Sequence, residues 1–402
     1  MVLFTGKGGV GKTTLAAATA AHLARSGRKT LAVSTDPAHS LGDALEAGLR
    51  HEPVEVEGVD GLFAAHVDAR ALLDGTWGRL REHLATILAG AGVDELVADE
   101  LTVLPGVEEL LALAAVRRAA QSGPWDVVVV DCGPTAETLR LLALPEALSG
   151  YLERLFPAHR RAVRGLLARD RADARRWDRT AEALDDLVDE LAGLRTLLAS
   201  PQTGIRLVLT PERVVAAETR RTLTALALLG LRVDGLVVNR MLPVPPADAA
   251  GEAARWLRER ATEQAAVLAD VAGLGLPVRT AGHASAEPTG VGALLRLAAD
   301  LWGDDDPAAE PGPAAPLLAV RRTAGAGRSA DAEFELALHL PGAAAAPLDL
   351  ARVGDELAVT VAGVRRLVAL PAVLRRCTVT RARLEGDDLR VAFRPDPALW
   401  LR

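Results

Sequence analysis

The chain has 402 residues, of which half are apolar, and a formal net charge of −7 at pH 7. This length is enough for two globular domains, while the negative charge gives no sign of nucleic-acid affinity, so we expect no nucleic-acid partner. The sequence has two cysteines and lacks both a targeting signal and an apolar run of the ~18 residues that span a bilayer. We therefore expect a soluble cytoplasmic protein.

A glycine-rich turn separates the apolar residues 1–4 from a helical pattern at 15–25. Strand, loop and helix in this order are the context of a phosphate-binding loop, whose glycines allow the backbone to wrap around an anion. We interpret the turn as a binding loop for ATP, with Lys12 on the β- and γ-phosphates and the Thr13 hydroxyl on Mg²⁺. A flexible turn is the alternative. The proposed nucleotide-binding residues here are Gly6, Lys7, Gly8, Gly9, Val10, Gly11, Lys12, Thr13 and Thr14.

Lysine is rare in this chain, and two of its three lysines lie in this loop. The run G-K-G-G-V-G-K-T-T resembles the deviant Walker A loop of partitioning ATPases, the nitrogenase iron protein, and the arsenical-pump and tail-anchored-protein-targeting ATPases. The resemblance implies that Lys7 is catalytic and reaches the nucleotide of the facing subunit in a homodimer. A solvent-exposed loop lysine is the alternative.

Asp36 follows the apolar strand predicted at 30–33. Side chains just past a strand's carboxyl end often carry the chemistry of an open α/β sheet, although an aspartate before proline also caps turns. The run D-P-A-H-S-L at 36–41 resembles switch I of the ArsA-like family. This resemblance implies that Asp36 orients the attacking water and contributes to the metal site.

A continuous apolar run at 127–130 predicts a buried parallel strand that ends in Asp131, within reach of Mg²⁺. The run D-C-G-P-T at 131–135 resembles switch II of the same family, which implies that the Gly133 N–H contacts the γ-phosphate as a catalytic group. Cys132 has no second cysteine nearby, so we expect no iron–sulfur cluster.

Residues 144–199 predict a helical insertion. In the targeting ATPases the corresponding helices form a methionine-rich client groove, whereas this chain has two methionines. An arginine-rich segment at 159–179 is either a solvated helix face or a peripheral contact with a membrane or an acidic partner.

A predicted strand at 233–240 places an amide, Asn239, near its end. The residue could be a simple turn former. The ending V-V-N-R instead resembles the strand end that carries the adenine-binding asparagine of the ArsA-like family. No cysteine follows at 241–246, so we expect no structural zinc.

Beyond residue 330 the apolar period changes to two, which predicts short strands in a β-sandwich. The runs F-E-L-A-L-H-L-P-G and D-E-L-A-V-T-V resemble the α-crystallin fold of small heat-shock proteins, which is known in some ArsA-like ATPases. The predicted organisation is a P-loop ATPase domain at 1–302 with an insertion at about 144–200, a linker at 303–330 and a β-sandwich at 331–402.

The sequence therefore predicts an α/β P-loop NTPase with a mostly parallel sheet and a helical insertion, followed by an all-β sandwich. The expected activity is that of an ArsA-like, Mg²⁺-dependent ATPase that acts as a homodimer on a client protein or a membrane-pump partner. Two alternatives stay open: an ATP-regulated holdase or assembly protein, and a partitioning-type positioning ATPase.

Overall fold

A computed structural model describes residues 1–36, 40–67, 107–132, 189, 192–309, 317–326, 329–343, 347–361 and 363–400. Most of the predicted helical insertion, the arginine-rich segment at 159–179 and Gly133 lie outside these residues. Within the described part of the chain, every helix is too short or too polar to cross a membrane.

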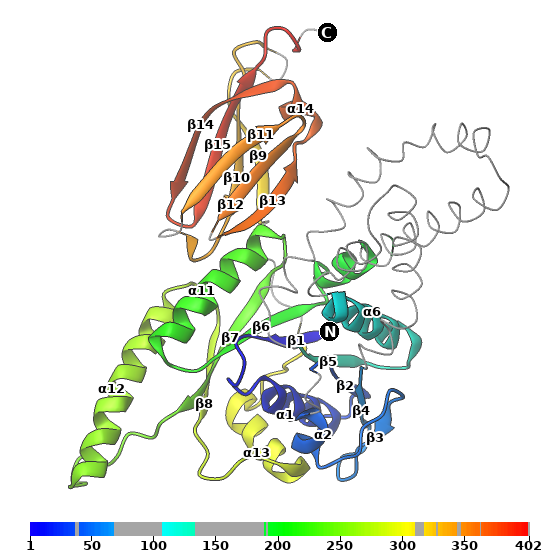
Figure 1. Ribbon diagram of the computed structural model, residues 1–402, viewed down its shortest axis with the longest axis vertical. Coiled ribbons are helices and arrows are strands. Elements are labelled where there is room, and N and C mark those ends of the chain that lie inside the picture. The colour runs from blue at the N-terminus through cyan, green and yellow to red at the C-terminus, as the bar shows by residue number, and fades with distance from the viewer. Residues whose placement is uncertain are drawn as a thin grey trace, which may run out of the picture.

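An eight-stranded sheet forms the centre of the larger domain (Figure 1). Its strand order is β3-β4-β2-β5-β1-β6-β7-β8, and every neighbouring pair is parallel except β3 and β4. The strands are β1 (Val2–Thr5), β2 (Thr30–Ser34), β3 (Val54–Glu55), β4 (Leu62–His66), β5 (Val127–Asp131), β6 (Gly204–Leu209), β7 (Val233–Met241) and β8 (Val278–Gly282). The central strands β2, β5, β1 and β6 are almost wholly buried, because both faces of the sheet are covered.

Helices cover both faces of this sheet and bury two separate apolar cores. One face carries α1 (Lys12–Arg25), α2 (Ser40–Leu45) and α13 (Gly290–Trp302). The other carries α6 (Val107–Ser122), α11 (Arg213–Leu228) and α12 (Glu252–Ala272). This architecture confirms the predicted α/β class with a mostly parallel sheet.

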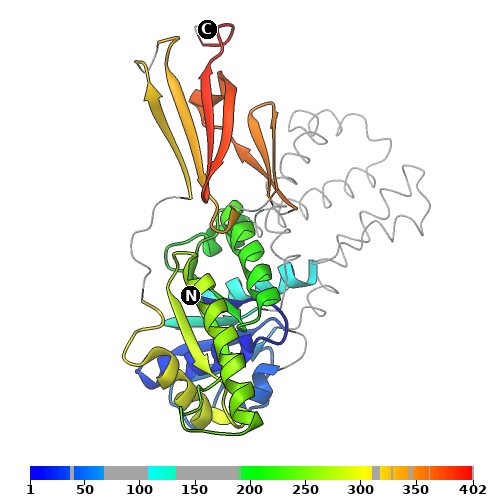
Figure 2. The same ribbon diagram turned by 90° about the vertical axis from the view of Figure 1, so that its left-hand side faces the viewer.

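The C-terminal part of the chain, residues 317–400, forms the β domain, which consists of two antiparallel sheets (Figures 1 and 2). One sheet has the order β14-β15-β10-β9 and the other β11-β12-β13. Alternating side chains such as Leu336 and Leu338 of β10 pack with Val359 and Phe393 in its core, which confirms the predicted period of two. The elements are β9 (Leu318–Ala324), β10 (Glu333–His339), β11 (Leu348–Val353), β12 (Glu356–Val361), β13 (Val364–Ala369), α14 (Ala372–Arg375), β14 (Cys377–Glu385) and β15 (Asp388–Pro395).

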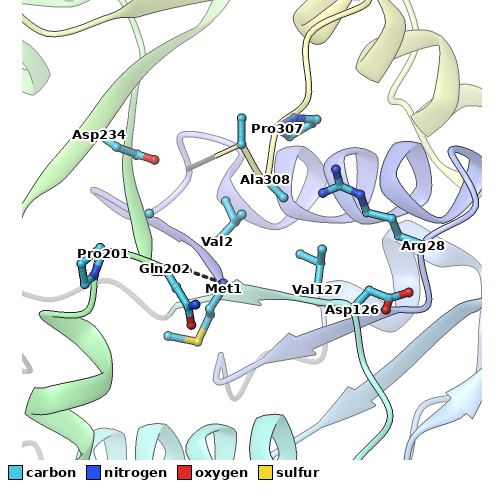
Figure 3. A pocket seen from close by; sticks show the side chains of 12 residues that line it. Met1, Val2, Arg28, Asp126, Val127, Pro201, Gln202, Asp234, Pro307 and Ala308 are labelled. Carbon is cyan, nitrogen blue, oxygen red and sulfur yellow. Dashed lines mark hydrogen bonds between the residues drawn. The ribbon is translucent and has the colours of Figure 1, made fainter. Parts of the chain in front are cut away.

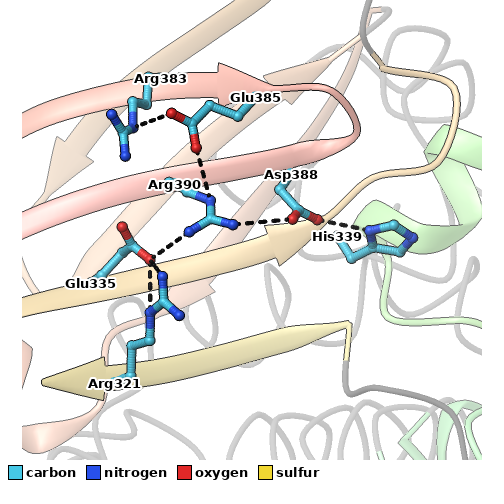
Figure 4. Close-up of polar contacts among 7 residues, drawn as sticks. All are labelled: Arg321, Glu335, His339, Arg383, Glu385, Asp388 and Arg390. Carbon is cyan, nitrogen blue, oxygen red and sulfur yellow. Dashed lines mark hydrogen bonds and ion pairs between the residues drawn. The ribbon is translucent and has the colours of Figure 1, made fainter. Parts of the chain in front are cut away.

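Strand β9 lies inside the segment 303–330 that the sequence predicts to be a linker. It pairs with β10 along its whole length, and the Arg321 guanidinium donates a hydrogen bond of 2.9 Å to Glu335 of β10. Glu335 also forms an ion pair of 3.3 Å with Arg390 of β15, so one carboxylate joins three strands (Figure 4). The apolar alternation of β9 is short and is flanked by Pro and Ala residues, so the sequence did not reveal this strand.

Candidate functional site

The glycine-rich loop connects β1 to α1 and requires glycine at particular positions. Gly6, Gly9 and Gly11 have φ angles of 144°, 78° and 92°, which side-chain-bearing residues rarely adopt. A Cβ on Gly6 would lie 2.2 Å from the Val208 carbonyl oxygen, so the loop packs directly against β6. The loop conformation therefore follows from its glycines, as the sequence predicts.

Helix α1 begins at Lys12, directly after the left-handed Gly11, and has no acidic residue in its first turn. Its free N–H groups and its dipole favour an anion at this end. The Lys12 side chain is buried, and its ammonium donates a hydrogen bond of 3.1 Å to the Lys7 carbonyl. Burial lowers the pKa of Lys12, and the nearby carboxylates of Asp131 and Asp36 act in the opposite direction.

Asp131, the last residue of β5, joins the loop to the sheet. Its Oδ2 accepts hydrogen bonds from the hydroxyls of Thr13, at 2.8 Å, and Ser34, at 2.9 Å. The side chain is 1 % exposed, and burial raises the pKa of its carboxyl group. Its Oδ1 is buried and has no hydrogen-bond partner among the residues that the structure describes.

The groups around Asp131 fit a magnesium ion. An unpartnered buried carboxylate oxygen beside the Thr13 hydroxyl supplies the hard oxygen ligands that Mg²⁺ prefers. Among the described residues, no group of three His, Cys, Asp or Glu side chains could hold a metal ion without further ligands. Mg²⁺ commonly takes its remaining ligands from water and nucleotide phosphates, so a small protein contribution is sufficient.

Ser34, the last residue of β2, is a site residue that the sequence analysis missed. Its hydroxyl donates to Asp131 and accepts a hydrogen bond of 3.1 Å from the backbone N–H of Asp36. This arrangement places Asp36 at the carboxyl edge of the sheet, beside the glycine-rich loop. A polar residue closing an otherwise apolar strand was the signal for it.

Asn239 of β7 contacts the loop from the other side. Its Nδ2 donates a hydrogen bond of 2.8 Å to the Val10 carbonyl, and its Oδ1 accepts one of 2.8 Å from the Arg240 N–H. A Cβ on Gly11 would lie 2.3 Å from this Nδ2. The amide keeps a second N–H and a second lone pair for a ligand.

Lys7 lies on the exposed side of the loop. Its ammonium is 3.3 Å from Oε2 of Glu218, a residue of α11, and both side chains are about two-fifths exposed, at 42 % and 41 %. Glu218 is a second residue that the sequence analysis missed, because no local pattern relates it to the loop.

A cavity of about 270 Å³ lies at the opposite edge of the sheet (Figure 3). It is lined by the amino ends of β1, β5 and β6, and the Met1 ammonium donates a hydrogen bond of 2.7 Å to Gln202 there. Ligands of open α/β sheets bind outside the carboxyl ends of the strands, where the glycine-rich loop lies. We therefore place the functional site at the loop.

The structure thus brings together most of the predicted site residues at one edge of the sheet. The glycine-rich loop, Asp36, Asp131 and Asn239 converge there from β1, β2, β5 and β7. Thr14 is half-buried in the first turn of α1. Gly133 lies outside the described residues, so its predicted role stays a prediction.

A parallel sheet with a glycine-rich loop between its central strand and a helix defines a phosphate-loop nucleotide-binding protein. The family model described as anion-transporting ATPase (ArsA ATPase) matches residues 1–303, and that of the HSP20-like domain found in ArsA matches residues 331–393. The chain belongs to the ArsA ATPase family and carries the HSP20-like domain associated with it.

Similar proteins occur in distant organisms. Protein Rv2184c of Mycobacterium tuberculosis is 41 % identical over 425 residues, covering 99 % of this chain and 96 % of its own. A candidate arsenical pump-driving ATPase of Chlorobaculum tepidum is 34 % identical, covering 93 % of this chain and 91 % of its own. An ATPase ASNA1 homolog of Babesia bovis is 32 % identical over 60 % of this chain and 66 % of its own. The resemblance derived from the loop and strand motifs is therefore confirmed at the level of the family.

Proposed function

We propose that the protein is a Mg²⁺-dependent ATPase that acts as a homodimer and uses hydrolysis to switch a region that binds a client or partner protein. The observation that carries this proposal is the cluster of Thr13, Asp131 and Ser34 beside the buried Lys12 ammonium. A triphosphate at the start of α1 would meet the helix dipole and this ammonium together.

The chain's own residues divide the work of phosphoryl transfer between them. The loop N–H groups and Lys12 hold the β- and γ-phosphates, while Thr13 and Asp131 hold the magnesium ion. When bound, Mg²⁺ neutralises charge on the phosphate oxygens. Asp36 orients the attacking water from the end of β2, and the Gly133 N–H contacts the γ-phosphate. Asn239 positions the adenine while it supports the loop at Val10.

The proposed dimer follows from Lys7 and from the single phosphate loop in the sequence. Lys7 of one subunit approaches the nucleotide of the other, so that two nucleotides lie between the subunits. Loss of the γ-phosphate then changes the segment after β5, which leads towards the predicted helical insertion. Nucleotide-dependent ordering of such segments is a known kind of switch.

Phosphate release by the full-length protein tests this function. We expect hydrolysis of ATP in the presence of Mg²⁺ and its loss in EDTA. The Asp36→Asn variant should lose turnover by about 100-fold or more while it still binds ATP, because it removes the group that orients water. Asp43→Asn, on the nearby helix α2, is the matched control and should retain turnover. Wild-type protein without ATPase activity, or Asp36→Asn with unchanged turnover, would contradict the proposal.

A further inference from the structure

Helix α11 packs against both domains. It has 16 residues, a length of about 24 Å. Leu223 and Leu226 lie in the core beneath the large sheet, whereas Ala225, Ala227 and Leu228 lie in the core of the β domain. The helix is therefore buried on all sides over its last turns, where Figure 1 shows it reaching the base of the β domain.

Two polar contacts fix this end of α11 to the β domain. The buried Thr224 hydroxyl donates a hydrogen bond of 2.7 Å to the Pro341 carbonyl, just after β10. The Arg366 guanidinium of β13 donates a hydrogen bond to the Leu228 carbonyl. That carbonyl belongs to the last turn of the helix, where a cation is favourable. The β domain is thus attached to this end of α11 by two hydrogen bonds in addition to its apolar contacts.

The first half of the same helix carries the partner of Lys7. Glu218 precedes Thr224 by six residues, about 9 Å along the helix axis. Its carboxylate holds the Lys7 ammonium against the chain's own α11. A lysine in this position is not available to a neighbouring subunit.

We propose that Glu218 is a positioning residue for Lys7, and that α11 couples the phosphate loop to the β domain through it. This inference rests on the proposed function, because it concerns the state in which Lys7 leaves Glu218 for a nucleotide. The β domain fixes α11, and α11 places Glu218 opposite Lys7. By reciprocity, nucleotide that draws Lys7 away also alters the docking of the β domain.

The size of the coupling follows from the exposure of the pair. Ion pairs between half-exposed side chains contribute about 0.2–1 kcal/mol, which corresponds to a shift of about 1.4- to fivefold in an equilibrium. A bound triphosphate can draw Lys7 away from such an ion pair. Loss of the ion pair by substitution nevertheless changes the fraction of protein in which Lys7 is free to reach a neighbouring subunit.

The test uses full-length protein and measures the concentration of Mg²⁺–AMPPNP that gives half-maximal dimer formation in sedimentation velocity. Glu218→Gln should lower this concentration by about 1.4- to fivefold, because Lys7 is released in advance. Glu218→Asp keeps the charge and should stay closer to wild type. Glu212→Gln makes the same change of charge at the start of α11, where no ion pair with Lys7 exists, and should have no effect.

Thr224→Val tests the route through the helix. It removes the hydrogen bond to Pro341, together with the 3.0 Å contact of the same hydroxyl with the Arg220 carbonyl of α11, without changing the size of the side chain. We expect a shift in the same direction as Glu218→Gln. Because both changes act on Lys7, the double variant should shift no further than the larger single effect. Single effects that multiply, or a Glu218→Gln protein identical to wild type, would overturn the inference while leaving the ATPase intact. Wild-type protein that neither hydrolyses ATP nor dimerises would overturn the proposed function and this inference with it.

Discussion

The hydroxyl of Thr13 donates a hydrogen bond of 2.8 Å to Oδ2 of Asp131, although 118 positions separate the two residues in the chain. The contact joins the first turn of α1 to the end of β5. The hydroxyl of Ser34, from β2, donates a second hydrogen bond to the same oxygen. One carboxylate thus fixes the loop to two strands while keeping its other oxygen for a ligand.

The Asp131→Asn substitution is expected to change how stability depends on pH. Burial raises the folded pKa of this carboxyl group above its ordinary value of 3.8, so ionisation costs folding free energy. The cost is absent below the unfolded pKa and grows as the pH rises through the folded pKa, by about 1.4 kcal/mol for each unit between the two values. Relative to wild type, Asp131→Asn should therefore gain stability between about pH 4 and pH 7.

Urea unfolding at both pH values measures this difference. The unpaired amide hydrogens of the new side chain add a constant cost at both pH values, so the change with pH is the informative quantity. If the free energies of unfolding of variant and wild type differ by the same amount at both pH values, the expected burial of charge at Asp131 is contradicted.

Substitution of Gly6 by Ala should destabilise the protein, whereas Gly8→Ala should not. Gly6 has a φ of 144°, and its new Cβ would meet the Val208 carbonyl at 2.2 Å. The backbone conformation alone costs about 1–3 kcal/mol for a residue with a side chain. A Cβ on Gly8 meets no atom of the described residues within 4 Å, which makes this neighbour a matched control. Equal urea midpoints for the two variants would refute the loop conformation.

Asn239→Ala is expected to weaken both the loop and the preference for adenine. The change leaves the Val10 carbonyl and the Arg240 N–H without their side-chain partner. Loss of a paired amide reduces discrimination between bases by about 1–3 kcal/mol. Competition of ATP and GTP for the site measures the preference directly. An unchanged ratio of the two dissociation constants would assign Asn239 a purely structural role.

The two cysteines should react with iodoacetamide only after unfolding. Both thiols are buried, and burial raises the pKa of Cys132 to about 12 and that of Cys377 above its ordinary value. The reactive thiolate is therefore scarce at neutral pH in the folded protein. Mass spectrometry of native and guanidinium-treated samples checks this expectation. Rapid labelling of Cys132 in native protein would show that the strand end opens readily.

Local sequence was sufficient for those parts of the site that depend on one segment. The glycines of the loop require particular backbone angles, and the apolar strand at 127–130 places Asp131 at its end, so both were predictable. Ser34 and Glu218 are different, because each acts through a residue far away in the chain. The polar end of an apolar strand marks Ser34 as a candidate, but the partners of both residues depend on which strands and helices become neighbours, and no local spacing encodes that.

The same distinction applies to the fold. The sequence predicted the alternation of strands and helices in the large sheet and the period of two beyond residue 330, because these patterns are local. It did not predict β9, whose alternation is short, or the 21-residue helix α12, whose charged residues obscure a narrow apolar face. The roles of Lys7 in a dimer and of Gly133 at the γ-phosphate stay predictions.

The apolar end of α11 has a consequence for how this protein can be divided. Residues 223–229 are all buried, and part of that burial is provided by the β domain. A protein severed between residues 309 and 317 would present Ala225 and Leu228 to water and tend to aggregate. We therefore expect the two domains to melt as one cooperative unit, and we expect a β domain exchanged between relatives to fold well only if the contacting residues of α11 are exchanged with it.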